Sequence, residues 1–238
     1  MKKTTFFPFL MVITLSVSTY GQSRPKVNGS GKVVTQEREA GYFNAVKVST
    51  AIDLILTQGN SESITVEADD NLHEYIVTEI KNNTLHIYTE ANIRDAREMN
   101  VYVTMKDIEE ISATSAGDVV GKSVITSDAL HLSTSSAGDI HLEVDVQKLS
   151  CRITSAGDMT LSGTTDELEA NLSSAGDLNA YDLTSRTASI SASSSGDAHI
   201  TVTEKLRARA SSAGNITFKG DPAEVDGHAS SAGHIHKF

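Results

Sequence analysis

A short motif of two small residues, a glycine and a polar residue returns seven times between Thr114 and the end of the chain. Its glycines are Gly117, Gly138, Gly157, Gly176, Gly196, Gly214 and Gly233, which are 21, 19, 19, 20, 18 and 19 residues apart. So regular a period indicates an array of repeats in which each unit packs only on its neighbours.

The residues between these motifs alternate between apolar and polar. Ile140 and Leu142 follow one motif, and Leu149, Cys151 and Ile153 precede the next. This period of two is typical of strands with one buried face and excludes the helical spacing of an α-solenoid. We therefore predict an all-β parallel β-helix with rungs of about 19 residues, each with two short strands and two corners.

The motif itself predicts a corner of the coil. Small side chains allow successive turns to approach closely, and glycine adopts backbone angles that other residues avoid. The seven glycines are therefore expected to be structural corner residues. Cys151 falls in the inner column with Leu132, Ala170, Ile190 and Ala208, which predicts a small buried side chain and not a nucleophile.

The domain prediction has three parts. Residues 1–21 are expected to be a signal peptide, residues 22–40 a polar lead, and residues 41–238 the β-helix domain. Within that domain, residues 41–113 alternate less regularly and are expected to cap one end of residues 114–238, because a repeat array needs an end that covers its core. A separate β-sandwich in residues 41–113 is the alternative.

The first residues predict export. Lys2 and Lys3 precede an apolar run from Phe6 to Val17, which is shorter than the roughly 20 residues of a membrane-spanning helix, and cleavage is expected near Gly21. The chain has no cysteine there to accept a lipid, so it is not expected to be a lipoprotein. The predicted location is the periplasm, the cell surface or the exterior. A single cysteine also means that the chain has no internal disulfide.

The net charge of −11 makes nucleic acid an unsuitable partner, because binding to phosphate backbones requires clustered Lys and Arg. Loss of Lys2 and Lys3 with the signal peptide would change this charge to −13.

Several segments share a recognisable pattern, namely residues 41–46, 53–59, 66–72, 85–87 and 101–104, followed by the serine- and glycine-rich repeats. Together they resemble the family described as putative auto-transporter adhesins with a head GIN domain. The resemblance implies an exported β-helical protein involved in adhesion. The chain lacks a C-terminal series of alternating strands that could form a barrel, so self-transport is not expected. The family brings no established catalytic residues to transfer.

The polar residue of each motif forms a predicted column on the outside of the stack. Its members are Asp118, Asp139, Asp158, Asp177 and Asp197, followed by Asn215 and His234. Carboxylates about 4.8 Å apart repel one another, and backbone N–H groups or water could relieve this. A second interpretation is a Ca²⁺ ladder, since Ca²⁺ binds six to eight oxygens, but one Asp per rung is sparse. No other cofactor or metal is expected.

The function predicted from these features is a non-enzymatic scaffold that binds a glycan or a protein at a cell surface. The outward positions that would contact the partner are His141, Thr160, Asn179, His199, Thr217 and His236. One alternative is a polysaccharide-active β-helix enzyme, which the short uniform corners disfavour because they leave little room for a groove. Another is a structural envelope protein that self-assembles into homo-oligomers through exposed strand edges.

Overall fold

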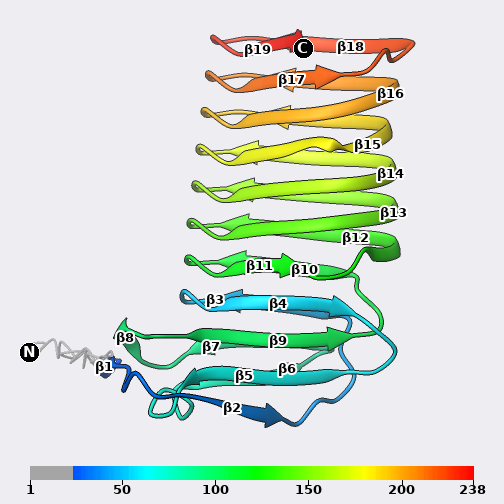
Figure 1. Cartoon of the computed structure of the whole chain (residues 1–238). Coiled ribbons are helices and arrows are strands. Elements are labelled where there is room, and N and C mark those ends of the chain that lie inside the picture. Colours follow the sequence, from blue (N-terminus) through cyan, green and yellow to red (C-terminus); the bar gives the residue numbers. More distant parts are fainter. Residues whose placement is uncertain (1–23) are drawn as a thin grey trace, which may run out of the picture.

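The computed structural model describes residues 24–238 as a single stack of flattened β-coils, with the N-terminal part at one end and the C-terminus at the other (Figure 1). These residues contain no helix, and hence none that could cross a membrane. The predicted signal peptide and its cleavage site lie outside the described residues. The fold is the predicted all-β parallel β-helix, with rungs of about 19 residues.

The strands fall into an irregular N-terminal group and a regular stack. The first group is β1 (Lys26–Asn28), β2 (Val33–Arg38), β3 (Ala45–Ser49), β4 (Asp53–Gln58), β5 (Ser63–Asp69), β6 (Ile76–Lys81), β7 (Thr84–Thr89), β8 (Asn92–Asp95) and β9 (Met99–Met105). The second group is β10 (Glu110–Thr114), β11 (Asp118–Gly121), β12 (Ile125–Ser135), β13 (Asp139–Thr154), β14 (Asp158–Ser173), β15 (Asp177–Ala192), β16 (Asp197–Ala210), β17 (Asn215–Lys219), β18 (Glu224–Ala229) and β19 (His234–Lys237).

Each regular coil has two faces. The first face follows the glycine corner and comprises β11, the first halves of β13 to β16, β17 and β19. The second face precedes the next corner and comprises β10, β12, the second halves of β13 to β16, and β18. Parallel pairing joins each coil to the next on both faces, as in the register of Asp139 with Asp158 and of Thr154 with Ser173.

Only one of the two predicted corners interrupts the strand. Strands β13, β14 and β15 each run for 16 residues through the bend between the faces, so the ladder continues there. At this bend Gly163 has a φ of +106°, and a Cβ on it would lie 2.0 Å from the carbonyl oxygen of Val144. The prediction of two separate strands per repeat is therefore wrong, because the bend is gradual enough to keep its hydrogen bonds.

The interior is filled by columns of aliphatic side chains from both faces. Leu132, Cys151, Ala170, Ile190 and Ala208 lie in register on successive coils, and all are at most 2% exposed. They belong to one continuous core that extends into the N-terminal strands. Because burying a Leu or Ile side chain contributes about 1.5–3 kcal/mol, this core is the main source of stability.

The corners are tight turns with an unusual backbone. The two residues before each glycine have positive φ, for example 55° at Ser155 and 57° at Ala156, and Gly157 N–H donates to the Thr154 carbonyl at 3.2 Å as in a type I′ turn. For residues other than glycine, this left-handed region costs about 1–2 kcal/mol each. The corners also hydrogen-bond to one another, since Ala156 N–H donates to Ser174 of the next coil at 3.0 Å.

Of the two reasons expected for the corner glycines, the close approach of successive coils is confirmed and the unusual backbone angle of the glycine is wrong. None of the seven has positive φ. Instead they lie against the coil below: a Cβ on Gly138 would approach the Ala113 carbonyl oxygen to 2.5 Å, and one on Gly214 would approach the Ala192 carbonyl oxygen to the same distance. Glycine is required because a side chain does not fit between stacked coils, while Ser and Ala adopt the unfavourable angles.

The N-terminal strands form the expected cap, but their order in space differs from their order in the chain (Figure 1). Strands β3 and β4 form a coil that pairs with β10 and β11 on one side and with β7 and β9 on the other. Beyond β7 and β9, the strands β6, β5 and β2 pair antiparallel and close the end. The alternative of a separate β-sandwich is wrong, because these strands share one sheet and one core with the repeats.

An eighth corner lies in this cap. Thr50 and Ala51 have φ of 65° and 54°, Ile52 occupies the position of the glycine, and Asp53 pairs with Asp118. The coil below has a longer connection, through β8, instead of another tight corner. The close approach that excludes a side chain is not repeated there, and Ile52 is fully buried.

Two substitutions at neighbouring positions should separate the close approach of coils at the glycine from the positive φ of the residue before it. Gly138→Ala places a Cβ against the Ala113 backbone and should lower the free energy of unfolding by about 1–3 kcal/mol. Ala137→Gly relieves a φ of 59° and should change it by less than about 1 kcal/mol, because the greater flexibility of the unfolded chain offsets that relief. Urea unfolding measures both. Equal losses in the two variants would contradict this account of the corner.

Candidate functional site

The first face presents a row of polar side chains in register along the stack. It comprises His141, Thr160, Asn179, His199, Thr217 and His236, which pair from one coil to the next. The prediction that Thr217 faces outward is wrong, because this residue is only 6% exposed. We call this set the outward row. Within residues 24–238, the side chains of His141, Thr160 and Asn179 are exposed and take part in none of the hydrogen bonds or ion pairs. Their polar groups are therefore available to a partner.

The row ends in a shallow depression near the last coils. Its volume is about 440 Å³, and Asp197, His199, Asn215, Thr217, His234 and His236 line it. Thr217 Oγ1 and His236 Nε2 are hydrogen-bonded at 2.9 Å, and Asn215 Nδ2 donates to Asp197 Oδ1 at 2.8 Å. The depression thus carries both donors and acceptors, on side chains that are already oriented.

The aspartate column lies beside the outward row, at the start of the first face. Asp118, Asp139, Asp158, Asp177 and Asp197 are in register, and Asn215 and His234 continue the column. Asp53 begins it one coil earlier, a member that the sequence analysis missed because its corner has no glycine. Each backbone N–H donates to the coil below, as Asp158 does to the Gly138 carbonyl at 3.1 Å.

The stacked carboxylates disfavour their own ionisation. Partial burial raises the pKa of Asp118, and the charges of Asp139 and Asp53 raise it further. Burial also raises the pKa of Asp158, with added repulsion from Asp139 and Asp177. Concerning the alternative interpretation as a Ca²⁺ ladder, no group of three or more His, Cys, Asp or Glu side chains in the described part of the chain is placed to hold a metal ion.

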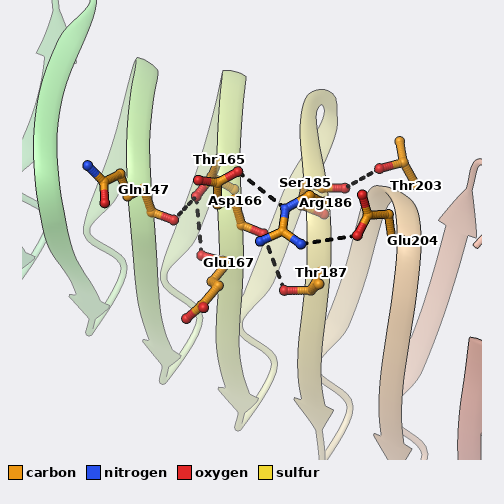
Figure 2. Close-up of polar contacts among 9 residues, drawn as sticks. All are labelled: Gln147, Thr165, Asp166, Glu167, Ser185, Arg186, Thr187, Thr203 and Glu204. Atoms are coloured by element: carbon orange, nitrogen blue, oxygen red, sulfur yellow. Dashed lines mark hydrogen bonds and ion pairs between the residues drawn. The ribbon is translucent and has the colours of Figure 1, made fainter.

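The bend between the faces carries a network of polar contacts across four coils, from β13 to β16 (Figure 2). Arg186 contacts Asp166 on one side at 3.4 Å and Glu204 on the other at 3.1 Å. Beneath it, the buried hydroxyls of Thr165 and Ser185 donate to backbone carbonyl groups, at 3.2 Å to Glu167 and 2.7 Å to Thr201.

These contacts give the bend a structural role. A depression of about 690 Å³ lies here, but its acidic side chains have internal partners: Gln147 donates to Asp128 at 3.1 Å and Thr164 donates to Asp145 at 2.7 Å. Exposed ion pairs such as those of Arg186 contribute about 0–1 kcal/mol each. The network holds successive coils in register and leaves few polar groups for a ligand.

The second face carries a groove of about 640 Å³ whose charges are also largely paired between coils. Lys148 contacts Glu167 at 3.6 Å, and Lys205 contacts Glu224 at 2.9 Å. Arg207 contacts Asp226 at 3.4 Å. By this comparison, the outward row of the first face is the better candidate for a binding surface.

An aromatic cluster on the first face was not predicted from the sequence. Tyr181 contacts His199, with ring centroids 5.1 Å apart, and Phe238, at 5.6 Å, and Lys219 lies over both Tyr181 and Phe238. The one available signal was the 20-residue interval between Gly176 and Gly196, which indicates an extra residue in that coil.

The raised pKa of Asp158 predicts a pH-dependent effect of Asp158→Asn. Above the ordinary value of 3.8, the unfolded chain releases the Asp158 proton more readily than the folded protein does, so this group lowers stability as pH rises through the window above 3.8. At pH 7 the variant should be more stable than the parent by about 1 kcal/mol, and the difference should vanish as pH falls towards 3.8. An amide fits the column, as Asn215 shows.

Urea unfolding from pH 4 to pH 8 measures this difference, with Glu143→Gln as the matched control. Glu143 is exposed on the same coil as Asp139 but lies outside the column. A parent protein as stable as Asp158→Asn at pH 7 would contradict repulsion within the column.

Cys151 should be unreactive in the folded protein. It is 1% exposed, and burial raises the pKa of its thiol to about 12. Because the thiolate is the reactive form, a thiol reagent at pH 8 should label the native protein far more slowly than the protein in denaturant, by a factor of at least about 100. Mass spectrometry of the two samples measures this, and rapid native labelling would refute burial.

Three solved structures share this fold at low sequence identity. A putative adhesin from Bacteroides fragilis has a TM-score of 0.84 and 24% identity and covers 89% of this chain and 100% of its own. A putative lipid binding protein from Parabacteroides distasonis has a TM-score of 0.76 and 22% identity, covering 90% and 99%. A putative adhesin from Parabacteroides merdae has a TM-score of 0.72 and 24% identity, also covering 90% and 99%.

No curated protein matches the chain. A family model described as "putative auto-transporter adhesin, head GIN domain" matches residues 42–222, which include most of the cap and most of the regular coils. This agrees with the resemblance stated from the sequence, and the chain belongs to this family.

Proposed function

We propose that this protein is an exported, non-enzymatic adhesin that binds a glycan or a protein at a cell surface through the outward row. The observation that carries the proposal is the contrast between the surfaces. On the second face and at the bend, most charged side chains pair with neighbouring coils, whereas His141, Thr160 and Asn179 on the first face have no internal partner among the described residues.

The spacing of the row suits an extended partner. Neighbouring coils are about 4.8 Å apart, so equivalent side chains repeat along the stack at that interval. A polymer lying along the first face would meet similar hydrogen-bonding groups on each coil, and the contributions of several weak contacts would add. Membership of the adhesin family supports the same function.

The absence of catalysis is part of the proposal. The corners consist of the same few residues in each repeat, so none forms a long loop that could wall a cleft around a substrate. Export is also proposed, from the apolar run that precedes Gly21.

Two pairs of substitutions on the same two coils test the binding surface. Thr160→Lys with Asn179→Lys changes neighbouring exposed positions of the outward row, and Asn171→Lys with Ser191→Lys changes neighbouring exposed positions of the second face. Binding of the purified proteins to arrays of glycans and extracellular-matrix proteins is measured first. The affinity for any partner found should then fall at least about 10-fold in the first variant and less than about 2-fold in the second.

Matched thermal unfolding of the two variants confirms that both are folded. Equal affinity losses, or a loss confined to the second face, would refute the outward row as the binding surface. Release of soluble products from a bound polysaccharide would refute the non-enzymatic assignment.

A further inference from the structure

The aromatic cluster on the first face is built by successive coils of the stack. Tyr181 comes from β15, His199 from β16 and Lys219 from the end of β17, and Phe238 follows β19. The Lys219 ammonium lies 4.0 Å from the centroid of the Tyr181 ring and 4.8 Å from that of Phe238. The two rings are 5.6 Å apart and inclined at 55°, so together they form two sides of a cage around the ammonium group.

An irregularity in the stack places Tyr181 in this position. The register of β15 with β16 shifts between Ala180, which pairs with Ile200, and Thr184, which pairs with Thr201. The extra length contains Tyr181, and Thr201 Oγ1 donates to the Tyr181 carbonyl at 2.7 Å. Bulges of this kind redirect side chains without breaking the sheet. Phe238 is fixed by its backbone N–H, which donates to the Phe218 carbonyl at 2.9 Å.

The charge of Lys219 is not neutralised by a carboxylate. It belongs to none of the ion pairs within residues 24–238, whereas Lys205 contacts Glu224 at 2.9 Å and Lys237 contacts Asp221. A cation is attracted to the face of an aromatic ring, which holds the ammonium group in position and leaves its N–H donors free. Lys219 is thus a positioned cation without an anionic partner.

Two further features lie beside this cation. Phe238 is 78% exposed, so much of its ring remains open to a ligand. The depression lined by His199, Asn215 and His236 lies on the same coils and offers hydrogen-bonding groups. An apolar ring surface, a cation and an adjacent set of donors and acceptors together match a sugar ring, which has an apolar C–H face and several hydroxyl groups.

We propose that this cluster is a subsite for an acidic sugar residue, a pyranose that carries a carboxylate. Lys219 binds the carboxylate, the exposed ring of Phe238 packs against the C–H face, and the side chains of the depression bind hydroxyl groups. This inference rests on the proposed function and names the chemical class of the glycan. Because the chain has a net charge of −11, long-range repulsion opposes the binding of a polyanion. Salt should relieve this repulsion, because it screens distant charges more than it screens contacts within the subsite.

Isothermal titration with short oligomers of galacturonic acid tests the subsite, with galactose oligomers of equal length as the neutral comparison, at about 0.15 M salt where charges beyond about 8 Å are screened. The oligogalacturonate should bind the parent protein at least about 10-fold more tightly than the neutral oligomer. Lys219→Gln should abolish that preference, and Lys219→Arg should retain it within about 3-fold, because it keeps the charge and the contact with the rings. Phe238→Ala should weaken the binding of both oligomers.

Lys205→Gln is the matched control, since it removes a lysine paired on the second face. An oligogalacturonate that does not bind, binds no better than the neutral oligomer, or binds Lys219→Gln as it binds the parent would overturn the subsite. The subsite and the proposed function can fail independently. If the binding of a partner found on the arrays depends on Thr160 and Asn179 but not on Lys219, only the acidic-sugar subsite is overturned. Binding that depends on Lys219 but not on those two residues supports the subsite and contradicts binding of the partner along the outward row.

Discussion

The structure depends on the close, in-register stacking of one coil on the next. Parallel pairing sets a separation of about 4.8 Å, and a residue placed at one point of a coil therefore meets its equivalents above and below. In the interior this spacing packs Leu132, Cys151 and Ala170 into a continuous column. At the corner it excludes a side chain from Gly138, and on the surface it brings carboxylates such as Asp139 and Asp158 together. The favourable and unfavourable features share this one cause.

Much of the regular stack could be predicted because the repeat makes the register visible in the sequence. Alignment on the glycines places Cys151 beside Leu132 and Ala170, and the structure has the same neighbours. The role of the glycine could not be predicted in the same way. A sequence shows that a residue must be small but not whether a φ angle or a neighbouring backbone requires it, and here Ser155 and Ala156 adopt the positive φ.

The cap and the aromatic cluster were harder to predict from the sequence pattern than the regular stack. The corner at Thr50 was missed because Ile52 replaces its glycine, which a looser coil below permits. The outward row follows from the same register as the core, so His141, Thr160 and Asn179 were found by counting. The contact of Lys219 with Tyr181 was not found, because it depends on a bulge and on side chains that reach across several coils.

The position of the β3–β4 coil has a consequence for how the chain acquires its structure. This coil comes early in the sequence, yet it lies between β7 and β9, which follow it, and β10 and β11, which come later still. It cannot complete its pairing until about 50 further residues are present, a long-range closure that is slow relative to the addition of a neighbouring rung. The regular coils fold without such a delay, because each one pairs with a coil that has already formed. During synthesis from the N-terminus, closure of the cap is therefore the slow step, and the remaining rungs add to it in the order in which they emerge.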